Sequence, residues 1–128
     1  MGRIIAQVHI SNYQKPDKKL VCDALVDTGA AYMVLPLAWK DRLGNPEVIS
    51  TIPAEIATQE IVQAEICGPV RLQIEAFRTI ITEVMFLDMK PADGDYEPLL
   101  GYIPLEQSQV AVDMLGHRLV HVKTVDLK

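Results

Sequence analysis

One aspartate stands where a charged side chain is unusual, at the end of the apolar run Ala24-Leu25-Val26. This residue, Asp27, is followed by Thr28 and Gly29. An ionised carboxylate is costly to bury unless it is paired or hydrogen-bonded. Thr28 supplies a hydroxyl that can donate and accept, and Gly29 permits a tight turn that brings its own amide close to the carboxylate. The triplet is suited to hold a carboxylate at the floor of a groove, although an ordinary turn after a strand is the alternative interpretation.

Other residues with reactive groups are placed less favourably for chemistry. Asp113 lies within a predicted strand and is not followed by Thr or Gly, so a catalytic role fits it poorly. His117 and His121 fall on one face of a predicted strand, but a zinc site needs three or four converging ligands. Ser108 has no neighbouring base that would make it a nucleophile. We therefore predict no metal site and no cofactor.

The elements that position Asp27 are predicted to be mostly short strands. Alternating apolar and polar residues predict a hairpin over 3–10 and 20–26, which leads directly into Asp27. Pro36 stands where a first helical turn tolerates proline and Gly44 where a helix stops, so 37–43 is predicted to be a short helix. Four strands are predicted within 47–87, separated by interruptions at 58–60, at Gly68-Pro69 and at 77–78. The remaining predicted elements are a buried segment at 99–101, a helical turn at 104–107, and strands over 110–114 and 118–122.

Length and composition restrict the class of protein. The chain has 128 residues, of which 49% are hydrophobic, and this size fits a single domain over residues 1–128. Many short strands with one or two short helices favour a mainly β fold with a closed or sandwiched sheet. The net charge of −5 and the scattered Lys and Arg residues argue against a nucleic-acid partner. Without a signal-peptide pattern or a membrane-spanning apolar run, we expect a cytoplasmic protein in which Cys22 and Cys67 are free thiols.

A longer pattern surrounds the Asp27 triplet. An apolar strand enters Asp27-Thr28-Gly29-Ala30, a further apolar run follows at 31–36, and Leu99-Leu100-Gly101 occurs much later in the chain. This arrangement resembles the retropepsin-like (clan AA) aspartic proteases, and the segment from 99 to 122 looks like their cellular and prokaryotic, non-viral members. The resemblance extends over residues 8–122, which is nearly the whole chain.

The resemblance implies a closed acid-protease β-barrel that forms one subunit of a homodimer. Asp27 would be the catalytic residue, because the chain has one Asp-Thr-Gly and peptide hydrolysis in such enzymes uses two carboxylates that share a proton. Thr28 would brace the two loops across the dimer axis, with Gly29 and Ala30 completing the active-site loop. Leu99-Leu100-Gly101 would pack beneath that loop. The expected partners are a second copy of this chain and a peptide or protein substrate.

A flap hairpin over about 54–67 is also expected from the resemblance. Its tip residues, which would cover the substrate, are Ile56, Ala57, Thr58, Gln59, Glu60 and Ile61. The family usually has glycine at or near this tip, and here there is none, so a plain surface hairpin is a second interpretation. For the whole protein, the alternatives to an active endopeptidase are a protease-fold module that binds peptides with little turnover, and a β-domain in which Asp-Thr-Gly is only a turn.

Overall fold

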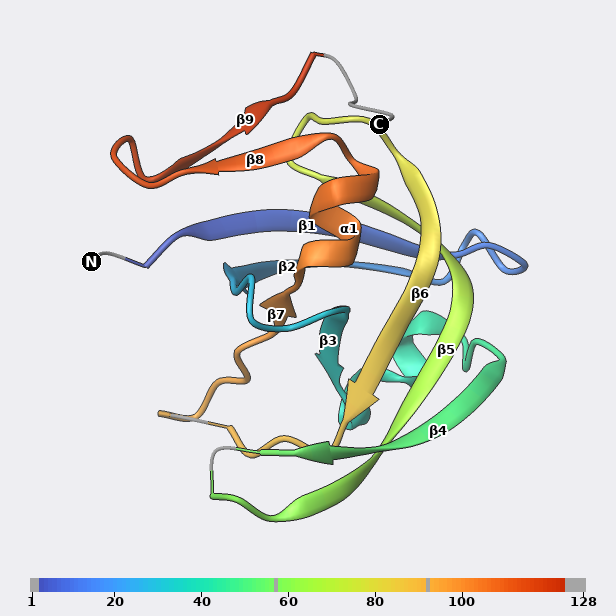
Figure 1. Cartoon of the computed structure of the whole chain (residues 1–128). Coiled ribbons are helices and arrows are strands. Elements are labelled where there is room, and N and C mark those ends of the chain that lie inside the picture. The colour runs from blue at the N-terminus through green and yellow to red at the C-terminus, as the bar shows by residue number, and fades with distance from the viewer. Residues whose placement is uncertain (1–2, 57, 92, 124–128) are drawn as a thin grey trace.

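Strands make up most of the regular structure in the computed structural model, which describes residues 3–56, 58–91 and 93–123 (Figure 1). The strands are β1 (Ile5–Asn12), β2 (Lys19–Val26), β3 (Met33–Pro36), β4 (Val48–Glu55), β5 (Ile61–Ile74), β6 (Ile80–Leu87), β7 (Leu99–Leu100), β8 (Val110–Asp113) and β9 (Arg118–His121). The helical segments are the 3-10 turns η1 (Leu37–Trp39) and η2 (Asp41–Leu43) and the helix α1 (Tyr102–Gln107). The fold is therefore mainly β, as the sequence predicts.

Strands β1 and β2 form the predicted antiparallel hairpin, with a register that runs from Ile5↔Leu25 to Ser11↔Lys19. Every second residue along most of both strands is buried, which is the burial expected from the alternating sequence. Buried Asn12 fixes the connection between them. Its side-chain amide donates to the Leu43 carbonyl at 3.0 Å, and its side-chain oxygen accepts the Gln14 amide at 2.9 Å. The hairpin therefore delivers Asp27 at the end of a well-anchored strand.

The strand pairings close on themselves. They run in the order β1-β2-β7-β3-β6-β5-β4, and β1 also pairs with β5. Within the described residues, β4 lies outside the resulting ring and pairs with β5. Strand β5 pairs with both β4 and β1, its first half with β4 and its second half with β1. Its length lets one strand connect the ring to the hairpin that extends beyond it (Figure 1).

Strand β5 also differs from the sequence prediction. The pair Gly68-Pro69 was expected to end a strand, whereas β5 continues through it. The pairing with β6 shifts its register between Cys67 and Val70, so the pair forms an irregularity within the strand. The prediction of four strands between 47 and 87 was therefore wrong, because β4, β5 and β6 fill that range.

The helix predicted over 37–43 is replaced by the two 3-10 turns η1 and η2. Pro36 keeps an extended backbone (φ −61°, ψ 136°) as the last residue of β3, so it does not begin a helix. Gly44 ends the segment in the left-handed conformation (φ 73°), as expected for a residue that stops a helix. Leu43 is buried in the core and anchors the segment to it.

The core fills the interior of the ring. Its largest fully buried side chains include Phe86, Ile10, Met33, Leu35, Leu72 and Leu100. Helix α1 adds Leu105 to this core, and the antiparallel hairpin β8–β9 follows it as a separate two-stranded sheet, as the sequence predicts (Figure 1). In the part of the chain that the structure describes, no helix has the length and apolar character needed to cross a membrane.

Candidate functional site

Asp27 lies immediately after β2 and is half-buried. Its backbone amide donates to the Leu100 carbonyl at 3.0 Å, and its backbone carbonyl accepts the Ala30 amide at 3.1 Å. The Gly29 amide donates to the Asp27 carboxylate, with 2.9 Å between N and Oδ1. Among the described residues, no ion pair involves Asp27. A backbone amide, rather than a cation of the same chain, thus holds this carboxylate.

Strand β7 fixes both arms of the Asp27 turn. It pairs in parallel with β2, where Leu25 faces Leu99 and Val26 faces Leu100. It also pairs antiparallel with β3, the strand that leaves the turn. Strand β7 therefore lies between the two strands that enter and leave the turn (Figure 1). Because both neighbours belong to the closed ring, the turn is attached to that ring on both sides.

Gly101 lets the chain pass directly beneath the turn. Its amide donates to the Tyr32 carbonyl at 3.0 Å, and the Tyr102 amide donates to the Ala30 carbonyl at 2.9 Å. A Cβ atom at position 101 would lie 2.5 Å from both of these carbonyl oxygens, which is closer than real contacts allow. Only glycine fits this approach without moving backbone. The structure thus brings Leu99, Leu100 and Gly101 against the Asp27 turn.

The other predicted loop residues have different surroundings. Thr28 and Gly29 are exposed, whereas Ala30 is half-buried. None of the side-chain hydrogen bonds within the described ranges involves the Thr28 hydroxyl. The predicted role of Thr28, to brace the corresponding loop of a second copy, stays a prediction because it requires that copy.

The predicted flap is a hairpin made by β4 and the first half of β5. At its tip the Ile56 amide donates to the Glu60 carbonyl at 3.0 Å, and the Gln59 amide donates to the Ile56 carbonyl at 2.8 Å. Gln59 has a φ of 66°, the left-handed conformation that glycine usually provides. Thr58 and Ile61 are exposed near it, and Ala57 lies outside the described residues. A turn without glycine therefore closes this hairpin.

A cavity of about 530 Å³ lies between this hairpin and the chain that leads from β6 to β7. One wall comes from the hairpin and the other from the chain after β6. The lining residues are Glu55, Ile56, Thr58, Glu60 and Val62 on the hairpin side, and Leu87, Asp88, Met89, Lys90, Glu97 and Leu99 on the other. Leu99 immediately precedes the residue whose carbonyl accepts the Asp27 amide. The cavity therefore begins next to the Asp27 turn.

The wall opposite the hairpin was not found by sequence reasoning. Leu87 is the last residue of the predicted strand region, and residues 88–90 begin a segment with the composition of a polar loop. Their contact with the hairpin depends on the pairing of β5 with β6, where Glu65 faces Phe86. A single sequence does not specify such a register between strands, so no local signal identified these residues.

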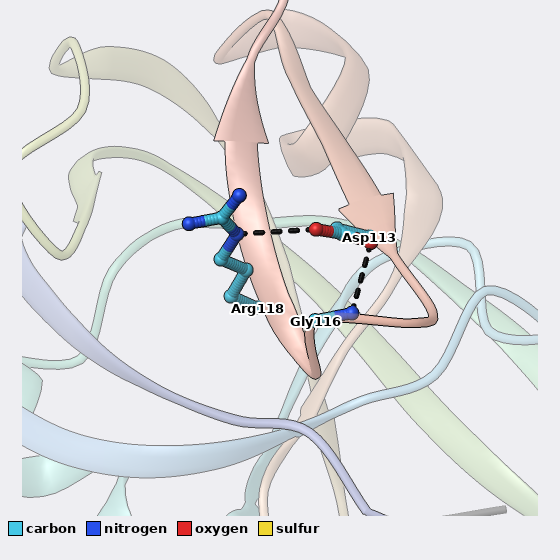
Figure 2. Close-up of polar contacts among 3 residues, drawn as sticks. All are labelled: Asp113, Gly116 and Arg118. Atoms are coloured by element: carbon cyan, nitrogen blue, oxygen red, sulfur yellow. Dashed lines mark hydrogen bonds and ion pairs between the residues drawn. The ribbon is translucent and has the colours of Figure 1, made fainter.

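Asp113 belongs to the β8–β9 hairpin and not to the Asp27 turn. Its carboxylate accepts the Gly116 amide at 3.0 Å and pairs with Arg118, with 3.1 Å between Nε and Oδ2 (Figure 2). The Gly116 amide, followed by the Arg118 side chain, holds the pKa of Asp113 below its usual value. These contacts give Asp113 a structural role at the end of the hairpin.

The remaining reactive side chains are not arranged for nucleophilic or metal chemistry. Cys22 and Cys67 are free and buried. Burial raises the pKa of Cys22 to about 12 and also raises the pKa of Cys67, so both thiols are protonated at neutral pH. Across residues 3–56, 58–91 and 93–123, no group of three or more His, Cys, Asp or Glu side chains is placed to hold a metal ion.

No protein-family model matches the chain, and no curated protein matches it either. A functional proposal therefore depends on the fold and on the geometry around Asp27.

Proposed function

We propose that this chain is a retropepsin-like aspartic endopeptidase whose active site combines Asp27 from two copies. The observation that carries the proposal is the Asp27 turn itself. The half-buried Asp27 accepts a hydrogen bond from the Gly29 amide through its carboxylate, and the two-residue strand β7, followed by Gly101, fixes the turn from below. The closed ring of strand pairings and the hairpin beside the cavity also agree with such a protease.

The need for a second copy follows from the chemistry. Two carboxylates close enough to share a proton differ in their protonation, so that one acts as a base and the other as an acid. One chain supplies one Asp-Thr-Gly turn. A twofold axis beside this turn brings two copies of Asp27 together, because each residue in such an interface lies near its symmetry mate. The homodimer would thus supply the pair.

The reaction needs only these two groups and water. The ionised carboxylate removes a proton from water while the water oxygen bonds to the carbonyl carbon of the peptide, and the protonated carboxyl donates its proton to the carbonyl oxygen. In the second step the C–N bond breaks, the nitrogen receives a proton from one carboxyl, and a hydroxyl of the intermediate returns a proton to the other. One water is consumed, and no covalent enzyme intermediate forms.

A second candidate function uses the same cavity. A module that binds extended peptides without cleaving them would also need an apolar groove beside a hairpin, and the lining of Ile56, Val62, Leu87 and Leu99 suits that role. The two functions differ in whether Asp27 performs chemistry. A substitution of Asp27 that keeps its shape but removes its acidity therefore distinguishes the two functions.

The test is to incubate wild type, Asp27→Asn and a control variant with a mixed peptide library between mildly acidic and neutral pH. Asp23→Asn is a matched control, because Asp23 is an exposed residue of β2 and its loss changes the charge equally. We expect wild type and Asp23→Asn to cleave peptides, and Asp27→Asn to lose at least about 1,000-fold in kcat/KM. Equal cleavage by wild type and Asp27→Asn would contradict the proposal. Binding without cleavage by any of the three would favour the peptide-binding module.

A further inference from the structure

The cavity beside the flap hairpin combines an apolar lining with an excess of carboxylates. Its apolar residues come from both walls, with Ile56 and Val62 on the hairpin and Leu87, Met89 and Leu99 on the other side. A volume of about 530 Å³ is sufficient for a long amino-acid side chain together with part of a peptide backbone. Leu99 belongs to β7, the strand that supports the Asp27 turn, so the cavity shares one wall residue with the support of that turn.

The charges around the cavity are unbalanced. Glu55 and Glu60 belong to the hairpin wall, and Asp88 and Lys90 belong to the opposite wall. Glu97 also lines the cavity, but its carboxylate is paired with Arg3. Within the described residues, none of the other three carboxylates forms an ion pair. Three carboxylates therefore face one ammonium group, which leaves an excess of negative charge around an apolar surface.

We propose that this cavity is a substrate subsite for a lysine or arginine side chain, an inference that rests on the proposed peptidase or peptide-binding function of the same site. The methylene stem of such a side chain packs on the apolar lining while its charged end reaches the carboxylates. A purely aliphatic side chain would fill the apolar part but would withdraw water from the carboxylates without pairing them. An acidic side chain would be repelled by them. The substrate class is thus an extended peptide with a basic residue near the cleaved bond.

The test measures binding, so that it does not depend on catalysis. The probes are fluorescent peptides whose two central residues are apolar. In each peptide, lysine, norleucine or glutamate replaces one of the four residues nearest the central bond. Their dissociation constants are measured by anisotropy with Asp27→Asn, which we expect to bind peptides without cleaving them, and cleavage rates are measured in parallel with wild type. We expect one position at which lysine binds about fivefold tighter than norleucine and at which glutamate binds more weakly than both. This preference should shrink as salt is raised.

Variants that remove charges from the cavity test whether the preference for lysine arises there. In the Asp27→Asn background, Glu55→Gln combined with Glu60→Gln should bring the ratio of lysine to norleucine affinity to about one, and Lys90→Gln should increase it. Glu106→Gln is the control, because Glu106 is exposed on α1 and does not line the cavity. Equal affinity for lysine and norleucine at all four positions would overturn the subsite, and so would a preference that survives the double substitution.

The two proposals fail in different ways. If wild type cleaves the peptides but does not distinguish lysine from norleucine, the protease proposal stands and the subsite is wrong. If lysine binds more tightly through Glu55 and Glu60 but no peptide is cleaved, the subsite stands and the protease proposal is wrong. Absence of binding by every peptide would overturn the subsite.

Discussion

Within the described residues, the carboxylates of two aspartates, Asp27 and Asp113, accept a hydrogen bond from a backbone amide, and they differ in what else surrounds them. Asp113 receives the Gly116 amide and also pairs with Arg118, so its negative charge is largely compensated within the hairpin (Figure 2). Asp27 receives the Gly29 amide, and no ion pair within the described ranges compensates its charge. A carboxylate compensated by a cation is a poor base, whereas one held only by a backbone donor can exchange protons with a neighbouring group. This difference at the level of single residues is why Asp27 carries the proposed chemistry.

The low pKa of Asp113 leads to a prediction about stability and pH. Its pKa is lower in the folded than in the unfolded protein, so ionised Asp113 stabilises the fold above the ordinary aspartate pKa, and this contribution is lost as the pH falls through the lowered value. Asp113→Asn should therefore lower Tm at pH 7, and this effect should shrink as the pH falls through the lowered pKa and the folded protein also takes up a proton at Asp113. Thermal unfolding across this pH range measures the difference. Cleavage activity should stay unchanged.

Asp17→Asn is the control for this measurement, because Asp17 is exposed in the β1–β2 connection and its substitution removes the same charge. It should shift Tm by less than Asp113→Asn at pH 7. An equal shift for Asp113→Asn at both ends of the pH range would mean that its contacts with Gly116 and Arg118 do not depend on ionisation, which would contradict the prediction.

At the level of elements, strand β7 has only two residues but holds both strands next to the Asp27 turn. It joins β2 to β3, and the backbone after it donates to Tyr32, Ala30 and Ala31. Gly101→Ala places a Cβ atom against backbone oxygens that cannot move without shifting the Asp27 turn. We expect a loss of about 3 kcal/mol in the free energy of unfolding, at the upper end of what overpacking usually costs. Urea denaturation measures this loss.

Gly94→Ala is the control for Gly101→Ala, because it tests the cost of a left-handed backbone without a steric clash. Gly94 has a φ of 83°, and a Cβ atom there would meet no atom within 4 Å. Its substitution should therefore cost only about 1 kcal/mol, from the left-handed conformation alone. If both variants lost the same stability, the close approach of Gly101 to the turn would not be the reason for glycine at position 101.

The elements also show how far sequence reasoning extends. Alternating residues predicted β1 and β2 well, because burial on one face fixes which residues must be apolar. The helix over 37–43 was wrong because Pro36 fits the end of a strand as well as the start of a helix. The break at Gly68-Pro69 was wrong because a register shift lets a strand pass through residues that usually end one. Local patterns do not distinguish these outcomes.

The candidate site was only partly predictable for a related reason. Asp27, Gly29 and the 99–101 segment are found from motifs, because each requires a particular residue type at a particular position. The cavity wall at 87–90 contains ordinary residues that lie opposite the hairpin only because β5 pairs with β6. The turn at Gln59 was also unexpected, since a left-handed conformation normally indicates glycine or asparagine.

At the level of the whole molecule, the hairpin of β4 and the first half of β5 lies partly outside the closed ring that holds the Asp27 turn. The Asp27 turn is attached to strands that pair on both sides, whereas β4 pairs with β5 and carries the hairpin away from the ring. The cavity lies where these two parts meet.

The proposed homodimer gives a prediction that a single-chain mechanism does not share. When equal amounts of wild type and Asp27→Asn are unfolded together and refolded, about one quarter of the dimers should contain two Asp27 residues. Activity per wild-type chain should then fall to about half of its value for wild type refolded alone, and total activity to about one quarter of that of an equal mixture with Asp23→Asn. Peptide cleavage at matched protein concentration measures this, and sedimentation equilibrium at micromolar concentration checks that the protein is dimeric. Unchanged activity per wild-type chain, or a strictly monomeric protein, would exclude the shared site.

The contact between the Asp27 amide and the Leu100 carbonyl has a consequence for biosynthesis. During translation, the strand that carries Asp27 emerges long before β7, and β3, β4, β5 and β6 are all made in between. Until Leu99, Leu100 and Gly101 have left the ribosome, the aspartate lies in a loop without its supporting strand. The closure of this long-range contact is also among the slower events in folding. A nascent or half-folded chain would thus have no organised Asp27 turn, and the proposed hydrolytic capacity would arise only after residues 99–101 have been made and have folded against that turn.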